Sequence, residues 1–194
     1  MLRKILIPAI ALIALAGCTG NTNWSRESPP DGTKVTVVEF SDFNCPACRA
    51  ASETASKIKG LPNLYFEFRH LPLPISGHES SPAAANTFEC AREQGFGQEM
   101  EEALFKNQGS FTESLFLRIP KTYDFDEDFD QTEFAECVSG NNYADLVEAD
   151  YNFARQQGLN STPTFFVNGI KTTYRDLLKT VAAAFEVQNA SSTE

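Results

Sequence analysis

Residues 37–48 read Val-Val-Glu-Phe-Ser-Asp-Phe-Asn-Cys-Pro-Ala-Cys, and this stretch decides the fold. The apolar run that ends at Phe40 predicts a buried strand. The two cysteines after a short polar turn predict the start of a helix, with Pro46 at a position that helix starts favour. A thiol at a helix N-terminus meets unpaired N–H groups and the positive end of the helix dipole, which favour the reactive thiolate. Zinc half-sites share the Cys-x-x-Cys spacing, but the strand before it and the helix after it indicate that Cys45 and Cys48 are a redox pair.

The N-terminus has the layout of an export signal, which we expect over residues 1–17. Two basic residues precede an apolar run, residues 5–16, that is too short to span a bilayer. Residues 15–18 read Leu-Ala-Gly-Cys and resemble the lipobox of bacterial lipoproteins. Cys18 is therefore expected to carry lipid after cleavage; an ordinary cleaved signal with an incidental cysteine is the alternative.

Cysteine count and charge restrict the compartment and the partners. The chain has five cysteines, so lipid on Cys18 leaves an even set of four, which suits an oxidising compartment. The formal net charge is -10, and an acidic protein of this kind is not expected to bind nucleic acid. The same charge repels anionic lipid headgroups, so membrane attachment would depend on the acyl chains.

The length of 194 residues and the 42% of apolar residues suit one domain with a sizeable core. Residues 18–33 are rich in Asn, Thr, Ser, Pro and Gly and predict a flexible tether. A strand over 34–40, a helix over about 46–59 and a strand over 64–71 predict a right-handed crossover and a parallel pair. Residues 188–194 predict a polar tail.

From residue 73 to about 159, strand patterns give way to capped helical segments, which we interpret as an all-helical insertion. The sheet resumes at residues 163–167, and an Asn-Gly pair predicts a hairpin before a short partner strand at 170–172. A final amphipathic helix is expected to pack on this sheet. The folded domain is therefore expected to span residues 34–187.

Cys90 and Cys137 each lie on an expected helix of the insertion, beside apolar residues of the same face. We expect both to point into one small core and to form a structural disulfide. The alternative is a pair of free buried cysteines that behave as small apolar residues.

Two well-separated stretches point to one family: residues 45–48, Cys-Pro-Ala-Cys after a strand, and residues 161–169, Ser-Thr-Pro-Thr-Phe-Phe-Val-Asn-Gly. Together they resemble the DsbA-like thiol-disulfide oxidoreductases, a branch of the thioredoxin superfamily. The resemblance covers residues 34–187. It implies an α/β thioredoxin fold with an inserted all-helical domain.

The resemblance also implies a role for each site residue. Cys45 would be the exposed sulfur that a client thiolate attacks, and Cys48 would be the buried resolving thiol. Pro163 would be a cis-proline that faces the cysteines, rather than an ordinary trans residue that opens a strand. The backbone at Thr162 would pair with an extended client segment.

Glu39 lies in the apolar strand, six residues before the first cysteine, where the family carries a buried acid. A desolvated acid there would relay a proton to or from Cys48; the alternative is that strand alternation turns it to solvent. Ala47 departs from the best-known members, which have a histidine at this position. The departure implies less stabilisation of the thiolate and a less oxidising disulfide. We expect structural roles for His70 and His78.

The resemblance implies an enzyme without a metal or other cofactor. It would be a lipid-anchored oxidase outside the cytoplasm that introduces disulfides into reduced or unfolded exported proteins. A quinone-linked membrane partner would re-oxidise it. A reductase or isomerase of the same fold is an alternative, and so is a metal-binding lipoprotein that uses the two cysteines as soft ligands.

Overall fold

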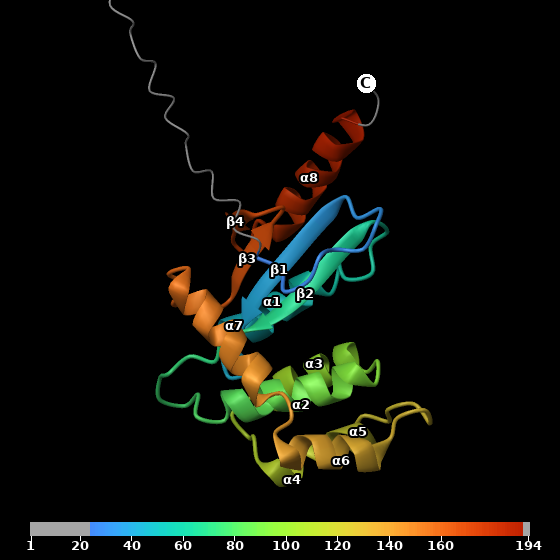
Figure 1. The fold of residues 1–194 in the computed structure, drawn as a ribbon, viewed down its shortest axis with the longest axis vertical. Coiled ribbons are helices and arrows are strands. Elements are labelled where there is room, and N and C mark those ends of the chain that lie inside the picture. Colours follow the sequence, from blue (N-terminus) through green and yellow to red (C-terminus); the bar gives the residue numbers. More distant parts are fainter. Residues whose placement is uncertain (1–23, 192–194) are drawn as a thin grey trace, which may run out of the picture.

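The computed structural model describes residues 24–191 and contains one four-stranded sheet with helices on both faces (Figure 1). The expected export signal and Cys18 lie outside the described residues. β1 pairs in parallel with β2 and antiparallel with β3, so the predicted parallel pair is confirmed. The strands, in the spatial order β2-β1-β3-β4, are β1 (Val35–Ser41), β2 (Leu64–His70), β3 (Thr164–Val167) and β4 (Ile170–Thr172).

Some helices cover the two faces of the sheet. The others form the part of the insertion that lies beyond one end of the sheet (Figure 1). Because side chains alternate along a strand, β1 directs Val35 and Val37 toward α1 and α8, and Val38 and Phe40 toward α7. The helices are α1 (Pro46–Ala55), α2 (Ser81–Glu93), α3 (Gly97–Lys106), α4 (Glu113–Phe116), α5 (Ile119–Thr122), α6 (Gln131–Gly140), α7 (Ala144–Gln156) and α8 (Leu177–Ser191). The fold is thus a mixed α/β sheet with an all-helical insertion, as predicted.

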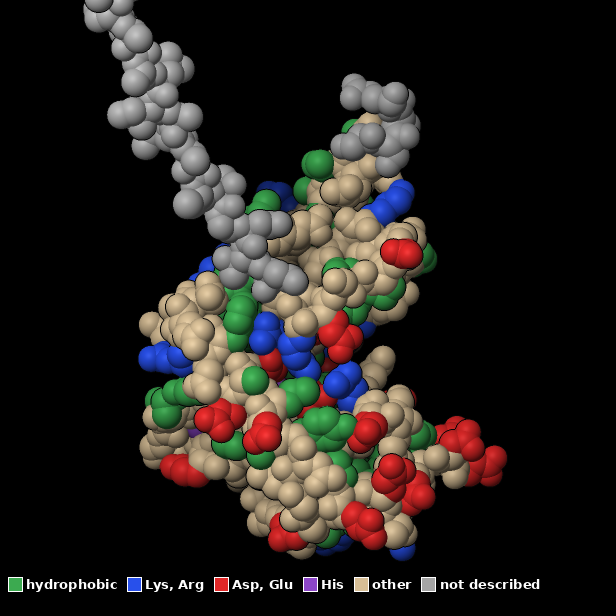
Figure 2. Space-filling view, in the orientation of Figure 1, with side chains coloured by type: hydrophobic (Ala, Val, Ile, Leu, Met, Phe, Trp, Pro, Cys, Tyr) green, Lys and Arg blue, Asp and Glu red, His purple; other side chains and the backbone are tan. Residues whose placement is uncertain are grey.

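Acidic side chains are spread over the insertion, whereas basic side chains gather where the insertion meets the sheet (Figure 2). The full chain has 26 acidic and 16 basic residues. No helix within residues 24–191 is both long and apolar enough to cross a membrane.

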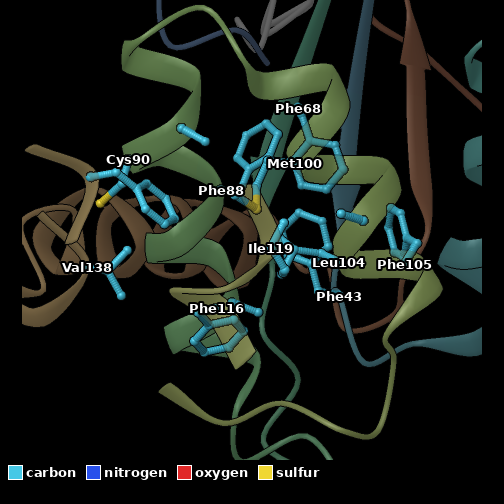
Figure 3. Packing of buried hydrophobic residues seen from close by; sticks show 14 of the residues in the cluster. Phe43, Phe68, Phe88, Cys90, Met100, Leu104, Phe105, Phe116, Ile119 and Val138 are labelled. Atoms are coloured by element: carbon cyan, nitrogen blue, oxygen red, sulfur yellow. The ribbon is translucent and has the colours of Figure 1, made fainter. Parts of the chain in front are cut away.

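The core of the insertion is continuous with the turn that precedes the cysteines (Figure 3). Phe43 of this turn, Phe68 of β2 and Phe88 of α2 have ring centroids 5.1 to 5.6 Å apart. Met100 and Leu104 of α3 are fully buried in the same cluster. The insertion therefore packs directly against the active-site turn, and its aromatic contacts restrict how far that turn can move.

Cys90 of α2 and Cys137 of α6 form a disulfide, with their Cα atoms 5.8 Å apart. These are the two cysteines that the sequence analysis pairs. The disulfide closes a segment of 47 residues within the insertion. In the chain-entropy description, a loop of this length restricts the unfolded chain by about 4 kcal/mol.

The prediction of a flexible tether up to residue 33 is wrong for the part that carries Trp24 and Arg26. The Trp24 ring stacks on Phe166, with centroids 3.6 Å apart, and meets Phe40 and Phe153 edge-on. The backbone N–H of Arg26 donates to a carboxylate oxygen of β2 at 2.9 Å, and its side chain reaches α2 and α7. The polar composition of this segment predicts no packing. Its one aromatic ring, Trp24, nevertheless packs on aromatic side chains of the domain.

Two predicted boundaries also differ from the structure. α1 ends at Ala55, and turns then lead to Gly60, whose positive φ of 82° suits the end of a helical segment. α8 continues to Ser191, so residues 188–191 are helical rather than part of a frayed tail. One reason is visible in the side chains: the Lys34 ammonium donates a hydrogen bond to Asn189 at 2.8 Å.

Candidate active site

Cys45 is the N-cap residue of α1, and Pro46 occupies the first helical position. The Cys45 carbonyl accepts hydrogen bonds from the N–H groups of Cys48 (3.0 Å) and Arg49 (3.2 Å), which starts the helix. Both cysteines are free thiols in this structure. Cys45 retains 7% of its exposed area and Cys48 retains 0%, so the predicted order of exposure holds, although Cys45 is more covered than expected.

The two sulfurs have opposite acidities. A hydrogen bond from the Cys48 thiol lowers the pKa of Cys45 to about 5, against the effect of burial; Thr162 and the N–H groups of Cys48 and Ala47 also lower it. Burial raises the pKa of Cys48 far above its ordinary value, and the hydrogen bond that it donates to Cys45 adds to this effect. At neutral pH the reduced site therefore holds a Cys45 thiolate beside a Cys48 thiol.

The peptide bond between Thr162 and Pro163 is cis, and it lies at the sulfur of Cys45. The Cys45 Sγ atom is 3.5 Å from the Thr162 carbonyl oxygen, although the two residues are 117 positions apart. This is the arrangement that the resemblance implies for Pro163. It places backbone groups of the Thr162 segment beside the sulfur of Cys45.

Asp42 holds the turn between β1 and α1, and the sequence analysis does not identify it. It is buried, and its two carboxylate oxygens accept four hydrogen bonds, from the N–H groups of Asn44 and Leu73 (both 2.7 Å), the Ser81 hydroxyl (2.6 Å) and Nδ1 of His78 (2.8 Å). Three of these donors belong to the segment that enters the insertion. The role of His78 is therefore to position the active-site turn, consistent with the structural role expected for it.

The insertion also contacts the site through the loop after α3. The Gln108 side chain donates to the Cys45 carbonyl at 2.8 Å, and the N–H of Gly109 donates to the Asn44 side chain at 3.4 Å. The loop after α3 therefore lies against the backbone of the active-site turn.

A groove of about 710 Å³ lies beside this network, but neither cysteine lines it. Its walls include Leu73, Ile75 and His78 of the segment before α2, with Val147 and Tyr151 of α7. The groove is therefore connected to the active-site turn through the partners of Asp42, and the thiol chemistry itself takes place outside it.

His70 lies in a second buried network, away from the Asp42 turn. Its Nε2 atom is 2.7 Å from Oε1 of Glu89. Burial alone would raise the pKa of Glu89, but the hydrogen bond and charge of His70 and the charges of Arg26 and Arg92 hold it at about 2. The network joins the N-terminal segment, β2 and α2, which is the structural role expected for this histidine.

Glu39 is fully buried at the centre of β1. It shares a strand face with Val37, so it points toward α1 and not toward solvent, and the solvent-facing alternative is wrong. Burial raises its pKa to about 8; Lys59 opposes this effect, and Glu101 and Cys45 add to it. Neither carboxylate oxygen has a partner at full hydrogen-bond geometry in the described part of the chain, and the Ser41 hydroxyl beside them lowers the pKa of Glu39 slightly. An acid in this state is protonated near neutral pH. Where it ionises, its negative charge raises the pKa of Cys48.

Within residues 24–191, no three His, Cys, Asp or Glu side chains are grouped in a way that would hold a metal ion. The arrangement instead combines a stabilised thiolate, a buried second thiol and a protonated acid. These are the groups required for thiol–disulfide exchange.

Comparisons with known proteins agree with this geometry. The model of a family described as thioredoxin matches residues 31–185. The crystal structure of a thioredoxin-like oxidoreductase from Silicibacter pomeroyi DSS-3 is 28% identical, with a TM-score of 0.64 over 80% of this chain and 88% of that one. Oxidised BdbD from Bacillus subtilis is 24% identical, with a TM-score of 0.66 over 81% of this chain and 90% of that one, and shares the fold.

Curated relatives include proteins with a different name. The Na(+)/H(+) antiporter NhaA 1 of Salinispora arenicola is 34% identical over 145 residues, which is 74% of this chain. A protein named NhaA 1 from a Mycobacterium species is 35% identical over 143 residues. The chain spans only about a fifth of the length of these relatives. A match of this length falls largely within the thioredoxin region of this chain.

The unequal acidity of the cysteines predicts a thiolate at mildly acidic pH. Ultraviolet absorbance of the reduced protein should show one thiolate forming with a midpoint near pH 5, and Cys45→Ser should abolish it. Cys48→Ala should raise the midpoint, because it removes the largest stabilising hydrogen bond. The lowered pKa also means that this thiol stabilises the reduced fold increasingly from about pH 5 to pH 9 and loses that contribution as the pH falls through 5. A midpoint near the ordinary value of about 8.5 would contradict the proposed environment of Cys45.

Proposed function

Because this chain belongs to the thioredoxin family, we propose that it is a thiol-disulfide oxidoreductase that introduces disulfides into exported proteins. The observation that carries the proposal is the unequal pair at the start of α1, with the pKa of Cys45 lowered to about 5 and that of Cys48 raised. Stabilising the thiolate of the reduced form makes the disulfide a better oxidant. The direction of reaction that this pair favours is therefore oxidation of the client.

In the first step, a client thiolate attacks Sγ of Cys45 in the oxidised enzyme. The Cys45–Cys48 bond breaks, a client–Cys45 disulfide forms, and Cys48 leaves with the electron pair. Burial makes a Cys48 thiolate costly, so it takes a proton at once. Glu39 is the donor that we assign, since it is buried and protonated near neutral pH, and since its carboxylate form is close enough to Cys48 to raise the pKa of that thiol.

In the second step, another client thiolate attacks the client sulfur of the mixed disulfide. The client gains a disulfide and loses two electrons, and Cys45 leaves as a thiolate. A thiol with a pKa of about 5 is a good leaving group, which favours this step over the return of the client to its reduced form. Ala47 offers no charged or hydrogen-bonding side chain, so the thiolate depends on Cys48, Thr162 and the helix N–H groups.

The reduced enzyme needs an oxidant that accepts two electrons, and we assign this role to a quinone-linked membrane partner. The client would lie along the segment of Thr162 and Pro163, where main-chain pairing tolerates many sequences. An enzyme that oxidises unfolded exported chains needs this tolerance. The disulfide between Cys90 and Cys137 fits the same oxidising compartment outside the cytoplasm.

Oxidation of a reduced, unfolded client with several cysteines tests this proposal. The oxidised wild-type protein should remove about two client thiols per molecule and become reduced. Cys48→Ala and Cys45→Ala should each leave the client thiols unchanged, because neither variant can form the active-site disulfide that accepts the two electrons. Failure of the wild-type protein to remove client thiols would overturn the proposed activity.

We further propose that Cys18 carries lipid, which would hold the domain close to a membrane. Only five residues separate Cys18 from the packed Trp24, so the reach of this connection is at most about 20 Å. The acidic surface does not attract anionic headgroups, so attachment would depend on the acyl chains.

Cys18→Ser should release the protein from the membrane fraction and block processing of the precursor. The wild-type protein should remain membrane-bound at high salt, because acyl attachment is not screened as charge attraction is. Unchanged membrane association and unchanged processing in Cys18→Ser would contradict the lipid anchor.

A further inference from the structure

An ion pair between Lys59 and Glu101 joins the turn after α1 to α3 of the insertion. The two side chains are only 17% and 8% exposed, so this is not an ordinary surface pair. The Lys59 ammonium also lies 4.7 Å from the centroid of the Phe66 ring, which helps to hold it in place. The pair is therefore a fixed charge arrangement near the back of the redox site.

Both partners act on the buried acid Glu39, in opposite directions. The positive charge of Lys59 favours the Glu39 carboxylate, and the negative charge of Glu101 disfavours it. The other titratable groups coupled to Glu39 are Cys45 and Cys48. The carboxylate oxygens of Glu39 have no partner at full hydrogen-bond geometry among the described residues, and the cation that would stabilise them is bound to Glu101 instead.

A cleft of about 300 Å³ between α1 and α3 places this pair next to solvent. Lys59 and Glu101 line the cleft, whereas Glu39 does not and is fully buried. The pair therefore lies between the acid and the solvent. The remaining charged residues of the lining are Arg49, Glu53, Glu102 and Lys106.

We propose that Glu101 is a positioning residue for the redox reaction, which binds Lys59 and so keeps Glu39 protonated at neutral pH. The proposal rests on the assigned role of Glu39 as the proton donor to Cys48. When the Cys45–Cys48 bond breaks, the proton passes from Glu39 to the Cys48 sulfur and leaves a carboxylate. In the reduced site Glu39 is again protonated near neutral pH, so its carboxylate takes up a proton from solvent, and it releases one to solvent when Cys48 gives its proton back on re-oxidation.

Removing the charge of Glu101 should therefore ionise Glu39 at a lower pH. In Glu101→Gln the repulsion by the second carboxylate is lost and Lys59 is free to stabilise Glu39, and both effects act in the same direction. At pH 7 a smaller fraction of Glu39 would be protonated, and reaction of the oxidised enzyme with a client thiol should slow by about threefold or more. At pH 5 to 6 the variant should approach the wild-type rate.

Lys59→Met provides the opposite change. Lys59 has the larger effect on Glu39 of the two partners, so its loss should raise the pH at which the acid ionises even if Glu101 becomes neutral as well. Loss of packing or stability alone would move both variants the same way. Opposite shifts are thus a readout that a merely structural role of the ion pair would not produce.

The experiment measures the rate at which dithiothreitol reduces the oxidised full-length protein between pH 5 and 9, as a ratio of variant to wild type. The ionisation of Glu39 is followed in parallel by isotope-edited infrared spectroscopy, with Glu39→Gln to assign its band. Glu101→Asp should restore the wild-type profile. Glu102→Gln is the matched control: Glu102 is the next residue of α3, lines the same cleft and pairs with Lys106, but its side chain is 54% exposed.

Support for the proposal is a lower Glu39 midpoint in Glu101→Gln, a higher one in Lys59→Met, and wild-type behaviour of Glu101→Asp and Glu102→Gln. An unchanged midpoint in Glu101→Gln, or a rate loss that is equal at every pH, would overturn it while leaving the oxidoreductase activity intact. A wild-type pH profile in Glu39→Gln would remove Glu39 as the donor and the role of Glu101 with it. Failure of the wild-type disulfide to react with dithiol at all would instead overturn the proposed function.

Discussion

The site depends on the hydrogen bonds in the first turn of α1 that stabilise a thiolate on Cys45 and not on Cys48. Cys45 caps the helix and receives hydrogen bonds from Cys48 and from helix N–H groups, whereas Cys48 lies in a site where a charge is costly. This difference needs a helix that starts at Cys45 and a turn that does not move. β1 delivers the chain to that point, Pro46 fixes the first helical residue, and Asp42 holds the turn with four hydrogen bonds.

The helical insertion also helps to hold the turn before Cys45 in place. Its first segment supplies donors to Asp42, the loop after α3 binds the carbonyl of Cys45, and α3 itself carries the partner of Lys59. The aromatic core that includes Phe43 joins these contacts into one packed unit. The environment of the cysteines is therefore set from both sides, by the sheet beneath α1 and by the insertion beside it.

Sequence alone predicted the features that depend on residues close together in the chain. The strand before Cys45, the Asn-Gly hairpin and the alternation from strands to capped helices each depend on neighbouring residues, and the structure has them. The two distant motifs further implied the cis-proline and the thioredoxin fold. What sequence missed depends on contacts between distant segments. Trp24 looks like part of a polar tether until Phe166 is placed beneath it, and Asp42 looks like a turn residue until the segment 73–81 returns to it.

The reduction potential of the Cys45–Cys48 pair tests the central claim most directly, because it measures how much more the fold stabilises the reduced pair than the disulfide. Equilibration with glutathione buffers, followed by alkylation and mass analysis, gives this value for the intact protein. A stabilised Cys45 thiolate without a histidine at position 47 predicts an oxidising potential, between about -120 and -200 mV. A potential near that of thioredoxin, about -270 mV, would contradict the account and indicate a reductase.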